Sequence, residues 1–236
     1  MLPTSEYDRF ADIYQVWTDT AASTQDNLAF YVDAYINETG PVVELGVGDG
    51  RIAVAAAARG RSVIGVDLSG AMLERCRLRA EDAGVLDRLT LINADFRSFH
   101  LEAPAALIAL PYHSLGHLVT LDDKRRAIAN VFSQLRPGGH FVFDDFLMTP
   151  MVMDHMRRVQ LRAEYRSATG ADTLLWVTSL VDEASQSLRV VTWEDELDTE
   201  GALARRRYRR LSLSWLDPSQ ARALLIDAGF AIESCY

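Results

Sequence analysis

The chain has 236 residues, of which 49% are hydrophobic, and a formal net charge of −9 at pH 7. This length and composition allow one substantial hydrophobic core and favour a single domain with room for an insertion. The excess of acidic residues disfavours a nucleic-acid partner, because an acidic surface repels the phosphate backbone.

The composition also disfavours a membrane protein and a metalloprotein. No apolar run reaches the ~20 residues needed to span a bilayer, and Asp8, Arg9 and Asp12 interrupt the N-terminal stretch where a signal peptide would be apolar. Cys76 and Cys235 form neither a disulfide framework nor a metal-ligand spacing. We therefore expect a cytoplasmic protein with no membrane association and no metal site.

Strand and helix patterns alternate from residue 41 onward. Expected strands cover 41–45, 62–66, 89–93, 105–110 and 140–143, and expected helices cover 51–59, 69–82 and 122–135. Near-continuous apolar strands between helices predict an α/β, doubly wound, mostly parallel Rossmann-like sheet with helices on both faces. Ligands in such sheets bind beyond the carboxyl ends of the strands.

The pattern changes to period two after residue 159. Strand-like runs at 160–166, 174–181, 188–196 and 206–215 predict an antiparallel β insertion after the fifth strand. We therefore divide the chain into a ligand-binding domain, 1–158 and 216–236, and an insertion, 159–215. A last helix over 218–228 and a strand over 230–235 should complete the domain.

The run 205–210 contains five arginines and is the one candidate for a basic face. We interpret it as an exposed strand whose arginines protect a sheet edge and pair with the acidic residues 194–196. The alternative is a nucleic-acid contact. The charge balance of the whole chain favours the first interpretation.

The first expected strand ends in a glycine-rich turn. Glu44 stands two residues before Gly46, and glycines follow at 48 and 50. Such a turn into a helix lets a ligand lie against bare backbone, near the free N–H groups of the helix N-terminus. The dinucleotide fingerprint would place its third glycine at position 51, where this chain has Arg51.

Acidic residues also follow the second and third strands. Asp67 ends the second strand 21 residues after Gly46, where a carboxylate can accept ribose hydroxyls. Asp95 can accept from an adenine amine while the Phe96 ring packs on the purine. Asp67 could instead cap a helix and Phe96 could be core. The predicted cofactor-binding residues also include Leu68, Met72 and Leu110, which lie at or just after strand ends.

Together, these positions resemble motifs I to III of class I S-adenosylmethionine (SAM) dependent methyltransferases. From Tyr7 onward the chain resembles bacterial small-molecule N-methyltransferases, the group that methylates glycine, sarcosine and sugar amines. The resemblance rests on Tyr7-Asp8-x-x-Ala11-x-x-Tyr14, on Leu-Pro-Tyr-His-Ser-Leu-Gly-His-Leu at 110–118 and on the insertion. It implies that Tyr14 reaches the SAM carboxylate, and that the insertion covers the substrate or forms a homodimer surface.

Two departures from that family concern the substrate and the sheet. The sugar-amine enzymes have a tyrosine where this chain has Trp17, which removes a hydroxyl that would bind a polar substrate. The family sheet has a seventh strand, and this chain ends soon after the sixth. An open sheet edge predicts either lower stability or a homodimer that covers it.

The chemistry needs a lone pair held in line with the methyl–sulfur bond and a group that accepts a proton. His117 is the catalytic candidate, and its alternative role is that of a structural histidine at a helix start. Trp17, Tyr112, His113 and Asp145 are the candidate substrate-binding residues. We therefore expect a small-molecule N-methyltransferase that releases S-adenosylhomocysteine; an O-methyltransferase and a non-catalytic SAM-binding partner subunit are the alternatives.

Overall fold

The structure is a computed structural model that describes residues 6–20 and 22–235. Its central feature is a five-stranded parallel sheet with the strand order β3-β2-β1-β4-β5. The strands are β1 (Val42–Leu45), β2 (Val63–Asp67), β3 (Leu89–Asn93), β4 (Ala105–Leu110) and β5 (Leu135–Phe143). The strand order reverses between β1 and β4, and ligands bind at such a switch point.

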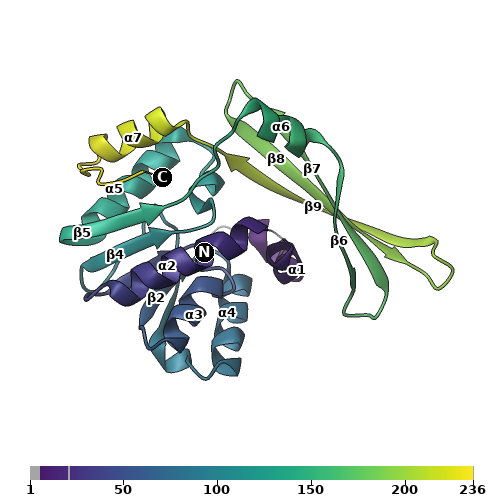
Figure 1. The fold of residues 1–236 in the computed structure, drawn as a ribbon, viewed down its shortest axis with the longest axis horizontal. Helices are drawn as coiled ribbons and strands as arrows, with labels where there is room; N and C mark the ends of the chain where they lie inside the picture. The colour runs from purple at the N-terminus through teal and green to yellow at the C-terminus, as the bar shows by residue number, and fades with distance from the viewer. Residues whose placement is uncertain (1–5, 21, 236) are drawn as a thin grey trace.

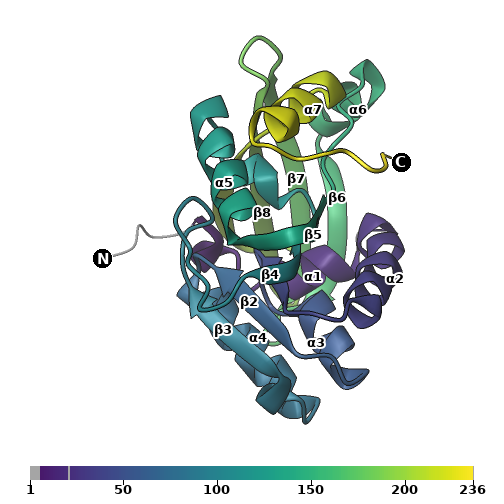
Figure 2. The ribbon, with the colours of Figure 1, turned by 90° about the vertical axis from the view of Figure 1, so that its left-hand side faces the viewer.

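Helices cover both faces of this sheet, with β5 and β3 at its two edges (Figure 2). One face packs against α2 (Ala22–Asn37), α3 (Arg51–Ala58) and α4 (Gly70–Asp82), and the other against α5 (Leu121–Gln134) and α7 (Pro218–Asp227). Every residue of β4 is buried, as expected for a parallel strand with helices on both sides. The expected doubly wound fold is confirmed.

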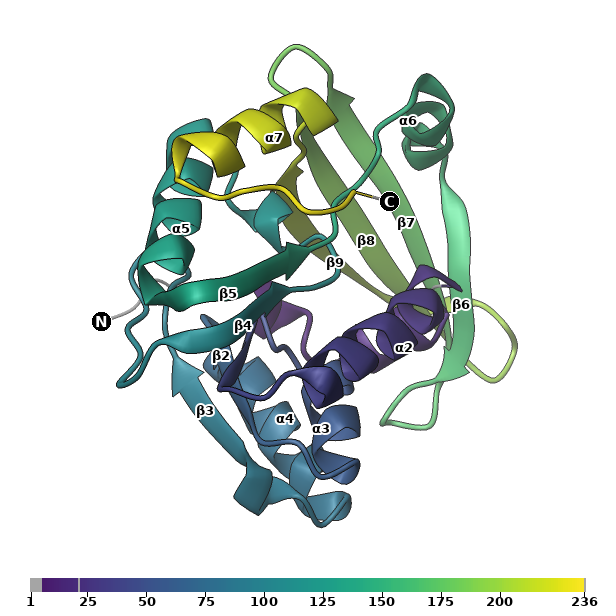
Figure 3. The same cartoon turned by 60° about the vertical axis from the view of Figure 1, so that its left-hand side comes forward.

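A second sheet, antiparallel with the order β6-β7-β8-β9, stands beside the first (Figures 1 and 3). Its strands are β6 (Gln160–Arg166), β7 (Asp172–Asp182), β8 (Ser187–Leu197) and β9 (Leu203–Ser214), and α6 (Pro150–Arg157) precedes them. The N-terminal segment, a short 3-10 helix η1 (Glu6–Arg9) and α1 (Tyr14–Asp19), packs Phe10 and Ile13 against this sheet. The predicted insertion after strand five is therefore present.

The arginine run behaves as a protected sheet edge. In the register of β8 and β9, Arg206 lies opposite Asp195 and Arg207 opposite Glu194. Arg206 donates two hydrogen bonds to Asp195, at 2.6 and 2.7 Å, and Arg209 is buried between Glu194 and Asp12. The expected pairing is confirmed for Arg206 and Arg209, whereas Arg207 pairs with Asp12 and Arg209 is buried and not exposed.

Three expectations about the elements need correction. The predicted strand over 230–235 is absent, because Gly229 turns the chain at φ +102° and Phe230 packs its ring on Phe132 and Phe141 instead. β5 begins at Leu135, not at residue 140, with an irregularity in its pairing to β4. The long helix α2 lies before the first element that the periodicity predicts.

The described residues contain no helix that is long and apolar enough to cross a membrane. Within the same residues, no group of three or more histidine, cysteine or acidic side chains is arranged to hold a metal ion. Cys76 is buried and Cys235 exposed, and neither is in a disulfide.

Candidate active site

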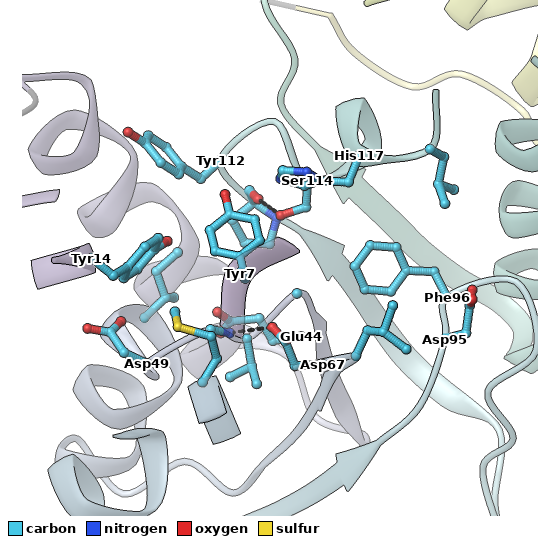
Figure 4. Close-up of a pocket in the computed structure, with 18 of the residues that line it drawn as sticks. Tyr7, Tyr14, Glu44, Asp49, Asp67, Asp95, Phe96, Tyr112, Ser114 and His117 are labelled. Carbon is cyan, nitrogen blue, oxygen red and sulfur yellow. Dashed lines mark hydrogen bonds between the residues drawn. The ribbon is translucent and has the colours of Figure 1, made fainter. Parts of the chain in front are cut away.

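A cavity of about 340 Å³ opens at the carboxyl ends of the central strands, where η1, the glycine turn and the loop after β4 meet (Figure 4). Eleven of the predicted site residues line it: Tyr14, Glu44, Gly46, Gly48, Asp67, Leu68, Met72, Asp95, Phe96, Tyr112 and His117. They come together because parallel strands all end at the same edge of the sheet.

The glycine turn forms the floor of the cavity, and side chains would not fit there. Gly46 and Gly48 have φ of +66° and +57°, which favours glycine. A Cβ atom on Gly46 would lie 2.8 Å from the Ser114 hydroxyl. A ligand can therefore approach the backbone closely at this point.

Asp67 is tied to the same turn. Its carboxylate accepts hydrogen bonds from the backbone N–H of Gly48 at 2.9 Å and of Ser69 at 2.8 Å. Burial raises the pKa of Asp67 above its usual value, and these two bonds oppose the shift. A carboxylate has about four acceptor sites in all, so these contacts with the turn do not by themselves prevent Asp67 from accepting a ribose hydroxyl.

Asp95 and Phe96 lie at another side of the cavity (Figure 4). The Arg97 guanidinium donates to both carboxylate oxygens of Asp95, at 2.9 and 2.5 Å, and to Asp123 at 2.8 Å. The hydrogen bonds from Arg97 hold the pKa of Asp95 below its usual value. The Phe96 ring is half-buried beside Gly46, so it serves the core and the cavity wall together.

Sequence reasoning did not assign a role to Arg51, which also lines the cavity. Arg51 begins α3, donates to Asn27 at 2.9 Å and lies 5.9 Å from the centre of the Tyr112 ring. Tyr14 and Asp49 lie on the same side, and Asp49 pairs with Arg79 at 2.5 Å. The sequence did mark this position, because Arg51 stands where the dinucleotide fingerprint has its third glycine.

Glu44 lies at the bottom of the cavity and is 3% exposed. Burial raises its pKa to about 8. Its Oε2 and the hydroxyl of Tyr35 are buried without a hydrogen-bond partner among the described residues. This carboxyl is therefore mostly neutral at pH 7, and a cation that enters the cavity would favour its ionised form.

His117 ends η3 (Ser114–His117), the short turn after β4. Its ring contacts Tyr7 edge to face, with 4.9 Å between centroids. Burial, reinforced by the charge of Lys124, lowers the pKa of His117 to about 4. The imidazole is therefore neutral at pH 7 and has a lone pair available. Tyr7 and Lys124 are further site neighbours that sequence reasoning missed.

The other four predicted residues do not line the cavity. Leu110 is buried in the core below it. Trp17 stacks against Arg162, whose guanidinium lies 5.1 Å from its ring. The expected cofactor contact of Leu110 is therefore indirect in this structure, because its side chain belongs to the hydrophobic cluster.

His113 and Asp145 form a half-buried group beside the cavity. The His113 ring stacks on Phe146 at 3.5 Å, and its Nδ1 lies 3.8 Å from Asp144 and 3.9 Å from Asp145. Tyr112 and His113 both have positive φ, 56° and 57°, so the backbone turns sharply here, and the centroids of the two rings lie 5.6 Å apart. Burial raises the pKa of Asp145 to about 6.

Part of this chain is similar to known methyltransferases in sequence. Residues 42–139 match the family model described as a methyltransferase domain. The tRNA 5-carboxymethoxyuridine methyltransferase of Escherichia coli K12 is 37% identical over 114 residues, 46% of this chain and 42% of its own length. The 27-O-demethylrifamycin SV methyltransferase of Amycolatopsis mediterranei is 26% identical over 160 residues, 61% of this chain and 58% of its own. The chain thus spans about half the length of the curated relatives it matches.

Solved structures share the fold over nearly the whole chain. CcbJ methyltransferase from Streptomyces caelestis superposes with a TM-score of 0.78 at 23% identity, covering 96% of this chain and 87% of that one. SAM-bound CalS10, an amino pentose methyltransferase from Micromonospora echinaspora, gives 0.68 at 21% identity, covering 90% and 83%. The predicted Rossmann-like fold is borne out, and CalS10, which shares it, is a methyltransferase with SAM bound.

Proposed function

We propose that this chain is a SAM-dependent methyltransferase that transfers a methyl group to the amine nitrogen of a small molecule. The observation that carries the proposal is that Asp67, the glycine turn and a neutral His117 line one cavity. The family match over 42–139 supports the cofactor. The likeness of fold to an amino pentose methyltransferase supports a small molecule that carries an amine as the acceptor.

The lining residues suit the parts of SAM. Asp67 would accept the ribose hydroxyls, Phe96 would pack on the adenine, and Tyr14 with Arg51 would bind the methionine carboxylate. Glu44, whose Oε2 is buried without a hydrogen-bond partner among the described residues, would bind the ammonium group at the methionine end of the cofactor. These assignments leave His117 and Tyr112 to face the acceptor.

The bound cofactor supplies an electrophilic methyl group on a sulfonium. The acceptor nitrogen forms a bond to this methyl as the carbon–sulfur bond breaks, and the bonding pair stays on sulfur. The acceptor amine would donate a hydrogen bond to the neutral His117 imidazole, which would orient the amine lone pair and share its proton. The excess proton would then leave to water, because an imidazole with a pKa of about 4 holds it poorly. Tyr7 packs on the His117 ring and limits its orientation.

Calorimetry with S-adenosylhomocysteine, followed by turnover assays with a panel of amines, tests the proposal. We expect micromolar binding, about −8 kcal/mol, and release of S-adenosylhomocysteine with an amine acceptor. Turnover only with hydroxyl acceptors would indicate an O-methyltransferase. Binding of S-adenosylhomocysteine with no turnover of any acceptor would indicate a non-catalytic SAM-binding subunit.

A second candidate function is methylation of an RNA, because the matched E. coli relative acts on tRNA. Against it, the arginines 206, 207 and 209 already pair with acidic side chains. We therefore expect no RNA binding at physiological salt. Filter binding of bulk tRNA at micromolar affinity would favour this candidate instead.

A further inference from the structure

Lys124, on α5, is a buried charged side chain that is not among the residues lining the cavity. It is 2% exposed, and its Nζ donates a hydrogen bond to the backbone carbonyl of Leu115 at 2.7 Å. Burial lowers its pKa to about 8, while the nearby Asp145 raises it. A methionine of similar length would fill this space without burying a charge. The lysine therefore calls for an explanation beyond packing.

The carbonyl that Lys124 binds belongs to the turn that carries His117. Leu115 is the second residue of η3, and His117 is the last. From the other side, the Ser214 hydroxyl of β9 donates to the carbonyl of Leu118 at 3.0 Å. A Cβ atom on Gly116 would lie 3.0 Å from the Ser214 carbonyl, so the turn is tightly enclosed. α5 and the inserted sheet thus hold η3 from two sides.

We propose that Lys124 is a positioning residue for His117, which fixes the turn through Leu115 and disfavours protonation of the imidazole by its positive charge. The proposal rests on the proposed function, since a neutral His117 can accept a hydrogen bond from the acceptor amine, whereas a protonated one cannot. Lys124 does not line the cavity. It would therefore act on His117 indirectly, through the position of the turn and through its positive charge.

The sign of the effect follows from the groups that face the two residues. Lys124 lies near Asp145 and the Leu115 carbonyl, and His117 lies near Tyr7, His113 and Lys124. The β9 residues Leu213 and Ser214, which face η3, are uncharged. Of these neighbours, charged Lys124 most opposes a second positive charge, so its loss should raise the pKa of His117.

The test compares three variants of the full chain: Lys124→Met, Lys124→Arg and Ser214→Ala. Both Lys124→Met and Ser214→Ala remove a hydrogen bond to the turn, but only the first removes a charge. The pKa of His117 is read by NMR from the imidazole carbon, with His117→Gln to assign the signal. We expect Lys124→Met to raise this pKa by roughly one pH unit, with little change in the other two variants.

At pH 5 this rise would convert the imidazole from about one tenth to about one half protonated. An unchanged pKa in Lys124→Met, or an equal rise in Ser214→Ala, would overturn the inference. Thermal melting shows whether each variant folds. If Lys124→Met does not fold, Lys124→Arg still tests the inference: it keeps the positive charge, so a rise in the His117 pKa in this variant would also overturn it. Full turnover in His117→Gln would instead refute the proposed function, and the NMR result would stand apart from it.

Discussion

The role of Asp67 gives the sharpest prediction about cofactor binding. Its carboxylate already accepts from Gly48 and Ser69, at 2.9 and 2.8 Å, so the side chain is fixed before a ligand arrives. Two added hydrogen bonds from ribose hydroxyls to a charged acceptor are each worth about 1.5–3 kcal/mol. Asp67→Ala should therefore lose about 3 kcal/mol or more, which is roughly a 100-fold rise in the Kd for S-adenosylhomocysteine.

Isothermal calorimetry measures this loss, and Asp67→Asn should fall between wild type and Asp67→Ala because it keeps one acceptor oxygen. The matched control is Ser69→Ala, which removes the N-cap bond to the Met72 N–H at 3.1 Å in the same turn. That change should cost about 1 kcal/mol of stability and leave affinity within about threefold, or about 0.65 kcal/mol. Asp67→Ala binding within threefold of wild type would refute the ribose assignment. Tight binding of NADH with no binding of S-adenosylhomocysteine would refute the cofactor assignment.

Four further predictions concern other parts of the site and the sheet. His117→Ala should lower kcat by roughly two to four orders of magnitude with unchanged S-adenosylhomocysteine affinity, and full turnover in rapid-quench assays would contradict this. Tyr14→Phe should weaken SAM binding by about 1 kcal/mol without a loss of kcat at saturation, so a loss in kcat alone would argue against a carboxylate contact. The folded-state pKa of Glu44 is raised to about 8, so the contribution of this carboxyl to stability is present at low pH and is lost as the pH rises toward 8. Glu44→Gln should therefore flatten the fall in Tm between about pH 5 and 8. An unchanged slope of Tm against pH would contradict the pKa shift. The open edge of β5 predicts either a low Tm or a homodimer, and light scattering that shows a monomer with a high Tm would count against both.

Most of the parallel sheet could be predicted because its strands are short apolar runs between helices. β3 and β4 occupy the predicted residues, and the acids after β1, β2 and β3 meet at one cavity because parallel strands end together. The strand over 230–235 was wrong because a glycine followed by an aromatic residue fits a strand and a packed loop equally well. Here the Phe230 side chain covers α5 and β5, and its backbone does not extend the sheet.

The residues around the acceptor were harder to predict, because a loop does not fix where side chains point. The positive φ values at Tyr112 and His113 leave Tyr112 in the cavity and turn His113 onto Phe146. Lys124 was missed for another reason. A lysine on an amphipathic helix is expected in solvent, and only the packed structure shows its hydrogen bond to Leu115.

Transfer of an isotopically labelled methyl group from SAM tests the central claim most directly. The protein would be incubated with labelled SAM and separate pools of small amines, small alcohols and bulk tRNA, and the labelled atom in each product would be identified by mass spectrometry and NMR. The account predicts label on the nitrogen of an amine, at a rate that His117→Ala lowers. Label only on oxygen or in RNA, at a rate that His117→Ala does not change, would contradict it.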